Sequence, residues 1–292
     1  MRRTHTRYVS LYRGLKMAKF TGIGWTRSTF NPWIGCTQVG PGCDACYAEV
    51  LDRRFYAAAH WGAGAPRLLT SDRNWNQLRR WNTEAKECGE FWPVFCASQA
   101  DVFDNEVPHE WRTRLWAEIR NAPHLTFQIV TKRIGNAVKM LPPDWGSGYP
   151  NVWIIATVVN QEEADRDIPK LKDVPAVIRG LSVEPMIAPM DLQVANRRHG
   201  GALIDGLDWV VVGGESKQPG HVVRDFDLDW GFALLAQCAT AGVPAFFKQM
   251  GHAPIRNGQR VSFTGKGATV FEWPREFRVQ EFPGGLEMLK AA

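Results

Sequence analysis

Six short apolar runs recur along the 292-residue chain, and each of them ends in polar residues. The runs are continuous, whereas a strand with one face in water alternates between apolar and polar side chains. Continuous runs of this length are typical of strands in a parallel sheet that is buried on both faces. They are FWPVFCAS (91–98), LTFQIVT (125–131), VWIIATVV (152–159), AVIRGLSVE (176–184), WVVVGGES (209–216) and PAFFKQ (244–249).

The segments between the runs have the pattern of crossover helices. Residues 109–122 and 228–242 place apolar side chains three and four positions apart, and Gly242 predicts the end of the second helix. Strands and helices that alternate every 25 to 35 residues or so indicate an α/β fold with a parallel sheet. No run is followed by a G-x-G-x-x-G or Walker motif, which favours a parallel (βα) barrel, a partial one of about six strand–helix units, over an open doubly wound sheet.

The chain divides into one main domain and two flanking segments. Residues 1–16 are basic, lack acidic residues and show no periodicity, which predicts a disordered arm, although Met17 offers the alternative that translation starts there. Residues 17–252 form the barrel domain. Residues 253–292 carry an Asn-Gly turn signal in RNGQRVSF and strand formers in ATVFEWPREFRV, which predict a short β-rich C-terminal appendage.

The apolar pattern also bears on the cellular compartment. No run of about 18 apolar residues is present, and the N-terminus has no apolar stretch of the kind found in secretory signals. We therefore expect a cytoplasmic protein with no membrane partner, in which the six cysteines are reduced thiols or metal ligands.

In a parallel barrel the working residues gather at the carboxyl ends of the strands. Here every apolar run ends in side chains that can bind a polar ligand, and six such strands predict one ringed pocket. One charged residue at a strand end is more often a solvated or salt-bridged loop residue, so only the whole set supports this prediction. The set is Ser98, Asp101, Asp104, Thr131, Lys132, Arg133, Thr157, Asn160, Ser182, Glu184, Glu215, Ser216, Lys248 and Gln249.

Three cysteines lie close together in the loop GCTQVGPGCDACYAE, at the spacing C-x6-C-x2-C. Because Cys36, Cys43 and Cys46 leave a tetrahedral zinc site one ligand short, a structural zinc ion would need a distant fourth ligand, His60 or Cys88. A second alternative is a [4Fe–4S] cluster that is held by three thiolates and has its fourth iron open. The third alternative is a group of reduced thiols that bind no metal.

The loop must bend if its sulfurs are to reach one centre. Extended, the seven residues from Cys36 to Cys43 would span roughly 24 Å, and we expect Gly40, Pro41 and Gly42 to supply the bend. An iron with an open site binds a further ligand, which in radical S-adenosylmethionine (SAM) enzymes is SAM, and reductive cleavage of SAM then starts radical chemistry.

Net charge and tryptophan content bear on the substrate. The net charge of +5 is compatible with a polyanionic partner. The chain has 13 tryptophans, and several of them lie in its first third beside basic stretches such as LRRW (78–81). Their rings either stack on exposed bases or, as most tryptophans do, pack in the core. These residues are Trp25, Trp33, Trp75, Trp81 and Trp92.

Seven blocks of the sequence carry a family resemblance, and they extend from Trp25 to Gly251. In chain order they are WTRSTFNPWIGCTQVGPGCDACYAE, FCASQADVFDNEVP, FQIVTKR, NVWIIATVVNQ, LSVEPMIAPMDL, WVVVGGES and VPAFFKQMG. Together they resemble the motifs of a phage-associated family of radical-SAM-like three-cysteine proteins. The resemblance implies a partial (βα) barrel and a cluster on the three cysteines. It also implies a protein partner, because members are often encoded beside a three-Cys-motif partner protein.

The resemblance suggests residues for SAM binding but no reaction. The wider radical-SAM pattern is C-x3-C-x2-C with Gly-Gly-Glu after the second strand, whereas here the first gap is six residues and GGE (213–215) lies in the fifth run. Glu215 is therefore a candidate for SAM binding, for substrate contact or for capping a turn. The candidate cofactor-binding residues are Ser98, Asp101, Lys132, Glu184 and Glu215.

Two functions from different classes are open. The first is a radical SAM-type enzyme that binds a [4Fe–4S] cluster through the cysteine loop and cleaves SAM, with a nucleobase, nucleotide or nucleic acid as the favoured substrate and an unspecified electron donor. The second is a non-catalytic, zinc-stabilised nucleic-acid-binding protein. The sequence offers no fourth ligand near the cysteines, which favours the cluster.

Overall fold

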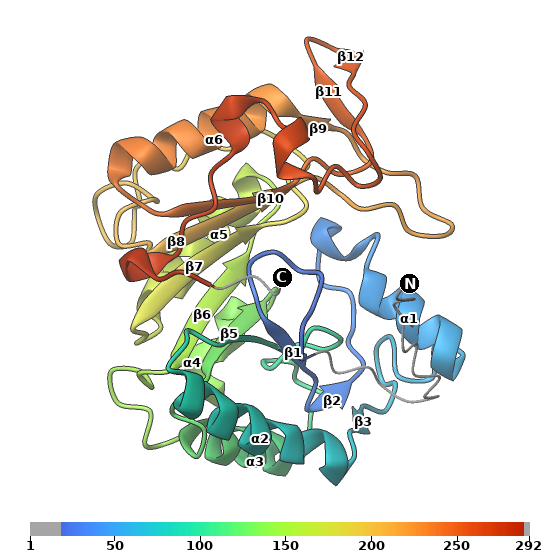
Figure 1. The fold of residues 1–292 in the computed structure, drawn as a ribbon, viewed down its shortest axis with the longest axis vertical. Coiled ribbons are helices and arrows are strands. Elements are labelled where there is room, and N and C mark those ends of the chain that lie inside the picture. The colour runs from blue at the N-terminus through green and yellow to red at the C-terminus, as the bar shows by residue number, and fades with distance from the viewer. Residues whose placement is uncertain (1–18, 289–292) are drawn as a thin grey trace, which may run out of the picture.

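The computed structural model describes residues 19–288 and is built on a seven-stranded sheet whose neighbouring strands are all parallel. The strand order β1-β4-β5-β6-β7-β8-β10 follows the chain, and the sheet curls into a half-barrel (Figure 1). This confirms the predicted partial parallel barrel, while the predicted arm at residues 1–16 lies outside the described residues. The strands are β1 (Ser28–Phe30), β4 (Pro93–Cys96), β5 (Thr126–Thr131), β6 (Val152–Thr157), β7 (Ile178–Val183), β8 (Trp209–Gly213) and β10 (Ala245–Gln249).

All six predicted runs are strands of this sheet. The remaining strand, β1, was not predicted, because it has three residues and no apolar run. Both predicted helices are present, as α3 and α6. Gly242 caps α6 with φ 68°, which confirms its expected role. Across the described range the helices are α1 (Tyr47–Tyr56), α2 (Asp72–Cys88), α3 (His109–Arg120), α4 (Ile134–Met140), α5 (Gln161–Asp173) and α6 (Leu228–Ala241).

The connection from β7 to β8 departs from the predicted strand–helix alternation, because residues 184–208 contain no helix. Pro185 and Pro189 lack the amide donors that a helix needs, and Gly200 has a positive φ of 72°. In place of a helix, Ala195 and Ala202 form an antiparallel bridge.

The C-terminal part is small and β-rich, as predicted. A hairpin joins β11 (Pro254–Arg256) to β12 (Gln259–Arg260), and β11 also pairs in parallel with β9 (Phe226–Asp227). Asn257 and Gly258 both have positive φ, so the Asn-Gly signal does form the hairpin turn. Beyond the hairpin the chain continues through three short 3-10 turns, at Val270–Glu272, Arg275–Phe277 and Pro283–Gly285. A second small sheet pairs β2 (Trp33–Ile34) with β3 (Leu68–Leu69) near the cysteine loop.

The two faces of the main sheet pack against different partners. The convex face joins the helices in one large core, to which β5 contributes Phe127 and Ile129. The concave face is filled by a second group, the concave aromatic cluster, in which β6 places Trp153 and Ile155. Since side chains alternate along a strand, Thr157 at the end of β6 lies on this concave face too. The members of the concave aromatic cluster are Trp25, Trp153, Ile155, Trp209, Val211, Phe246 and Phe282.

The five tryptophans of the first third all lie in the core. Each has at most 3% of its surface exposed, so none of these rings is available to stack on a base. The base-stacking interpretation of Trp25, Trp33, Trp75, Trp81 and Trp92 is therefore wrong, and the core-packing alternative is confirmed.

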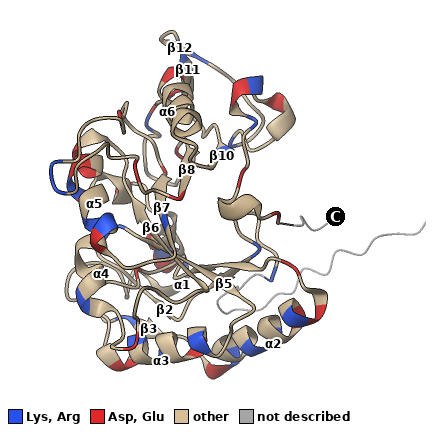
Figure 2. Ribbon diagram, turned by 90° about the vertical axis from the view of Figure 1, so that its left-hand side faces the viewer, with Lys and Arg blue, Asp and Glu red and all other residues tan. Residues whose placement is uncertain are grey.

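The surface of the helices is mixed in charge. Figure 2 shows basic and acidic residues interspersed along α2 and α3. Ion pairs at the surface, such as Arg79 with Glu118 and Arg114 with Asp72, join the two helices. Over residues 19–288, no helix combines the length and the apolar character that crossing a membrane requires.

We predict that Trp209→Ala destabilises the fold by about 3–5 kcal/mol, the usual cost of truncating a buried aromatic side chain. Trp209 is fully buried, contacts the rings of Trp25, Trp153, Phe246 and Phe282, and donates its indole N–H to a backbone carbonyl. Denaturant unfolding measures the change in the free energy of unfolding.

The matched control is Phe271→Ala, since Phe271 is an aromatic residue of the same chain that is 87% exposed. Its free energy of unfolding should stay within about 0.5 kcal/mol of the original protein. Equal effects of the two substitutions would contradict the role assigned to the concave aromatic cluster.

Candidate functional site

The three cysteines of the loop line one cavity at the carboxyl edge of β4, β5 and β6. The cavity has an empty volume of about 610 Å³, part of which is open solvent. Its floor is formed by Phe95 and Val130, which also pack on the concave aromatic cluster. The predicted site residues that line it are Cys36, Cys43, Cys46, Ser98, Asp101, Thr131, Lys132, Arg133 and Thr157.

The cysteine loop lies directly against the ends of β5 and β6. A Cβ atom on Gly42 would be 3.0 Å from Val159 and 3.2 Å from the Lys132 side chain, and one on Gly40 would be 2.7 Å from the Glu163 carboxylate. Neither glycine has a φ in the left-handed region, and Gly40 is extended. The chain does bend here, as expected, in a 3-10 turn at Pro41–Cys43 that follows Gly40. The two glycines are in addition needed for the close approach of the loop to the barrel.

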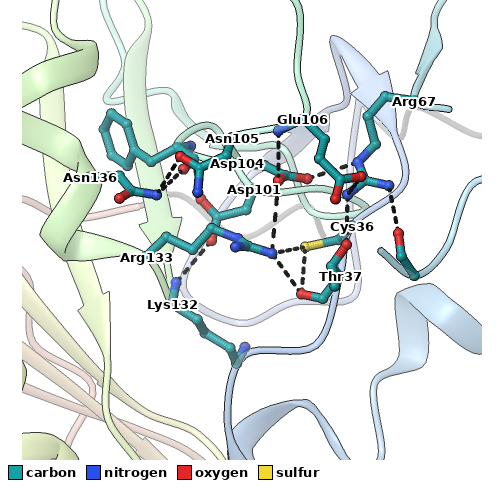
Figure 3. Close-up of polar contacts among 12 residues, drawn as sticks. Cys36, Thr37, Arg67, Asp101, Asp104, Asn105, Glu106, Lys132, Arg133 and Asn136 are labelled. Carbon is teal, nitrogen blue, oxygen red and sulfur yellow. Dashed lines mark hydrogen bonds and ion pairs between the residues drawn. The ribbon is translucent and has the colours of Figure 1, made fainter. Parts of the chain in front are cut away.

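A buried ionic network holds the chain beside Cys36 (Figure 3). Arg133 donates to the Thr37 carbonyl at 2.8 Å, and its guanidinium lies 4.0 Å from the Cys36 sulfur. Arg67 donates to the Thr37 hydroxyl at 2.8 Å and to the carboxylate of Asp104, also at 2.8 Å. Arg67 and Asp104 have at most 1% of their side chains exposed, so Thr37 is fixed from both sides by charged groups that water barely reaches.

The environment of Cys36 favours its neutral thiol as long as no metal is bound. Burial raises the pKa of this thiol to about 12, and Asp101 adds to the rise while Arg133 opposes it. A thiol must lose its proton to bind a metal, and a bound cation supplies the charge that favours this loss.

Lys132 places a positive charge beside the other two thiols. Removal from water lowers the pKa of Lys132, but the charges of Cys43, Cys46 and Asp101 outweigh this, and the net pKa is raised. The ammonium group is therefore charged at neutral pH. Lys132 and Arg133 are consecutive residues after β5, so the end of one strand places two positively charged side chains in the cavity that the three cysteines line.

Asp101 holds the ends of β4 and β5 together. Its carboxylate accepts hydrogen bonds from the Phe103 amide, the Thr131 hydroxyl and the Lys132 amide, at 2.8 to 3.0 Å. Burial raises the pKa of Asp101, and these hydrogen bonds oppose the rise. Asp101 lines the cavity, but both of its oxygen atoms are already engaged by the chain.

Ser98 and Thr157 present hydroxyls at two sides of the cavity. The Ser98 hydroxyl is bonded to Asn31, while the Ser98 carbonyl accepts from the hydroxyl of Tyr47, which anchors the start of α1. The Thr157 hydroxyl is buried and has no hydrogen-bond partner within the described part of the chain. A buried hydroxyl without a partner costs free energy, which a polar ligand in the cavity would recover.

Glu184 and Glu215 are not among the residues that line the cavity. Glu184 forms an ion pair with Lys248 at 2.8 Å. Glu215 binds the guanidinium and the backbone amide of Arg224. Arg224 in turn donates to the Pro41 carbonyl at 2.7 Å and contacts the Asp44 carboxylate at 3.1 Å. Glu215 thus acts on the cysteine loop through Arg224, a residue that the sequence pattern did not single out.

Neither of the two residues considered as a fourth zinc ligand is among those that line the cavity. The ring of His60 pairs with Asp52 at 2.8 Å, and Cys88 is exposed at the end of α2. Within residues 19–288, no group of three or more His, Cys, Asp or Glu side chains is arranged around a point where it could hold one metal ion. The thiolates of a four-iron cluster bind different irons, so the three cysteines need not converge on a single point.

Comparison with known proteins places the chain in a family. A family model described as "Protein of unknown function (DUF5131)" matches residues 20–272, which is most of the chain. The chain belongs to this DUF5131 family. A comparison with curated proteins gives no match. Among solved structures, one described as "Spore photoproduct lyase complexed with dinucleoside spore photoproduct" is similar, with 11% sequence identity and a TM-score of 0.37. The match covers 65% of the DUF5131 chain and 56% of that structure, so the chain spans little more than half of its length.

We predict that Arg224→Gln loosens the cysteine loop of the DUF5131 chain without unfolding the barrel. The amides of Cys43 and Asp44, which bond to carbonyls in the same loop, should exchange with solvent about tenfold faster. The reason is that a hydrogen bond from a charged donor contributes about 1.5 kcal/mol or more. Hydrogen exchange followed by mass spectrometry measures the effect.

Arg198→Gln is the matched control, because Arg198 forms an exposed ion pair with Asp173 and makes no contact with the loop. Exchange in the loop should be unchanged in this variant. Unaltered loop exchange in Arg224→Gln would show that Arg224 does not hold the loop.

Proposed function

We propose that this protein is a radical SAM-type iron–sulfur enzyme, in which Cys36, Cys43 and Cys46 hold a [4Fe–4S] cluster and SAM binds in the adjoining cavity. The observation that carries the proposal is the meeting of three thiols and two cations in one cavity, at the carboxyl edge of a parallel half-barrel. This edge is where parallel barrels place their reacting groups.

The donor set of the cavity suits such a cluster. Three thiolates supply soft sulfur ligands, and a cluster held by them alone keeps one iron open. The thiolates and the cluster together carry net negative charge, which Lys132 and Arg133 balance in surroundings of low dielectric constant. When bound, the cluster would supply the electron that cleaves SAM and starts radical chemistry on a substrate.

The chain's own residues then have distinct tasks. Arg133 and Arg67 fix the backbone beside Cys36, and Arg224 fixes the middle of the loop. The unpartnered hydroxyl of Thr157 is available to the polar groups of SAM, whereas Ser98 lines the cavity with its hydroxyl held by Asn31. Phe95 and Val130 line the cavity on the side of the concave aromatic cluster and give it an apolar wall.

The proposal extends to the partners. A nucleobase, nucleotide or nucleic acid is the substrate class, which the net charge of +5 supports. The resemblance to phage-associated three-cysteine proteins supports a protein partner of the three-Cys-motif type.

The proposal is tested by measuring iron, sulfide and zinc in anaerobically reconstituted protein. We expect about four irons per chain, as a [4Fe–4S] cluster requires, and an electron paramagnetic resonance signal of the reduced protein that changes when SAM is added. Stoichiometric zinc that reconstitution does not displace, without any response to SAM, would favour the zinc-stabilised binding protein.

We predict that Cys43→Ala removes the iron–sulfur absorbance and most of the iron, because two thiolates cannot hold the cluster. Circular dichroism should show the same secondary structure, since the cysteine loop lies outside the sheet. Cys88→Ala is the matched control, as Cys88 is an exposed cysteine outside the cavity, and it should keep its iron. Full iron content in Cys43→Ala would overturn the assignment of the ligands.

A further inference from the structure

The concave face has a second polar region, on the half of the barrel away from the cysteines. On β10, Phe246 belongs to the concave aromatic cluster, and Lys248 follows where the register with β8 shifts. A Cβ atom on Gly213, two residues beyond Val211 of that cluster, would be 2.9 Å from the Glu184 carboxylate, so the partner of Lys248 lies over the concave face. Glu184 follows β7 and forms the 2.8 Å ion pair with Lys248. The two side chains are 12% and 20% exposed, so the pair lies at the rim of the concave face, largely out of water.

A second lysine lies beside this pair and has no acidic partner of its own. Backbone hydrogen bonds from Gly251 to Lys266 and from Met250 to Gly267, at 3.0 and 2.9 Å, hold the segment of Lys266 against the end of β10. Lys266 is half-buried, and its side chain makes no hydrogen bond or ion pair with any residue that the structure describes. Burial and the charge of Lys248 lower the pKa of Lys266, and Glu184 opposes them only in part.

A third lysine completes the group. Lys217 follows β8, and its backbone amide donates to the ring of His252 at 3.0 Å. Burial lowers the pKa of His252, and the charges of Lys217 and Lys266 lower it further, so both lysines act on one imidazole. Glu215, the other carboxylate nearby, is already taken by Arg224. Lys248 and Lys266 are thus both near Glu184, and the exposed Lys217 lies beside His252, next to the segment of Lys266. With Glu184 as the carboxylate not taken by an arginine, the region has an excess of positive charge.

We propose that Lys217, Lys248 and Lys266 form a binding site for a phosphate group of the substrate, a conclusion that rests on the proposed function and adds a substrate class to it. Lysine binds phosphate as a point charge, and partial exclusion of water strengthens the attraction. Because the rim of β10 lies three strand spacings from Thr157, or about 14 Å, a phosphate held there anchors a molecule that extends along the concave face toward the cavity.

Two sources share this chemistry, a free nucleotide and a strand of nucleic acid. The test titrates full-length, metal-free protein at low ionic strength with four probes: inorganic phosphate, deoxyadenosine monophosphate, deoxyadenosine and a short single-stranded oligodeoxynucleotide. Isothermal calorimetry should detect the monophosphate and inorganic phosphate but not the uncharged nucleoside. Oligonucleotide binding at least as tight as that of the monophosphate identifies a strand, whereas binding of the monophosphate alone identifies a free nucleotide. Failure of every phosphate-bearing probe to bind overturns the proposal.

Substitutions locate the binding. Lys266→Gln should weaken binding about tenfold or more, since it removes one charge-assisted hydrogen bond. Glu184→Gln should strengthen binding, because it releases Lys248 from its carboxylate, an increase that damage to the fold would not produce. Lys86→Gln is the control, as Lys86 is exposed in α2. Equal affinity in Lys266→Gln and Lys86→Gln overturns the site.

The same preparations, reconstituted with iron and sulfide, separate the two proposals. Iron uptake without any phosphate binding would reject the phosphate site and leave the cluster standing. Phosphate binding that depends on Lys266 in a chain that takes up no iron would reject the cluster and leave the anion site.

Discussion

A parallel sheet that curls must fill its concave face with side chains, and this constraint decides where on that face a ligand can bind. In this chain large rings fill that face, with Trp153, Trp209 and Phe246 supplied by three different strands. Further along the same strands the inward positions become polar, at Thr157 on β6 and Lys248 on β10. The candidate site therefore lies at the carboxyl rim, beside the cysteine loop.

The rim is stabilised by charges that are buried in matched sets. Asp104 lies between Arg67 and Arg133, and its carboxylate is balanced by both guanidinium groups. A second ion pair at the rim joins the buried Glu215 to the partly exposed Arg224. A site made in this way has a fixed geometry before any ligand arrives, which limits the reorganisation that binding requires.

The recurring strands of the parallel sheet could be predicted from the sequence, because each apolar run marks one strand. Six of the seven strands of the main sheet have an apolar run of their own and were found, whereas β1 is buried but has no such run. The polar residue after β5, Lys132, proved to line the cavity. Arg67 and Arg224 could not be found this way, because they lie in irregular loops and their partners are distant in sequence. The role of Glu215 could not be predicted for the same reason. Its place at the end of an apolar run suggested contact with a ligand, but its carboxylate binds Arg224, which lies in the irregular loop after β8.

The contact between Arg224 and the Pro41 carbonyl joins residues that are 183 positions apart in the chain. A ribosome that adds 5–20 residues per second needs roughly 10–40 s to make that distance. During this interval the three cysteines have already been synthesised, but the residue that secures their loop has not. Under the proposed function, capture of the cluster in the final geometry is thus a late event in the life of the nascent chain, because Arg224 is synthesised only with the last third of the barrel.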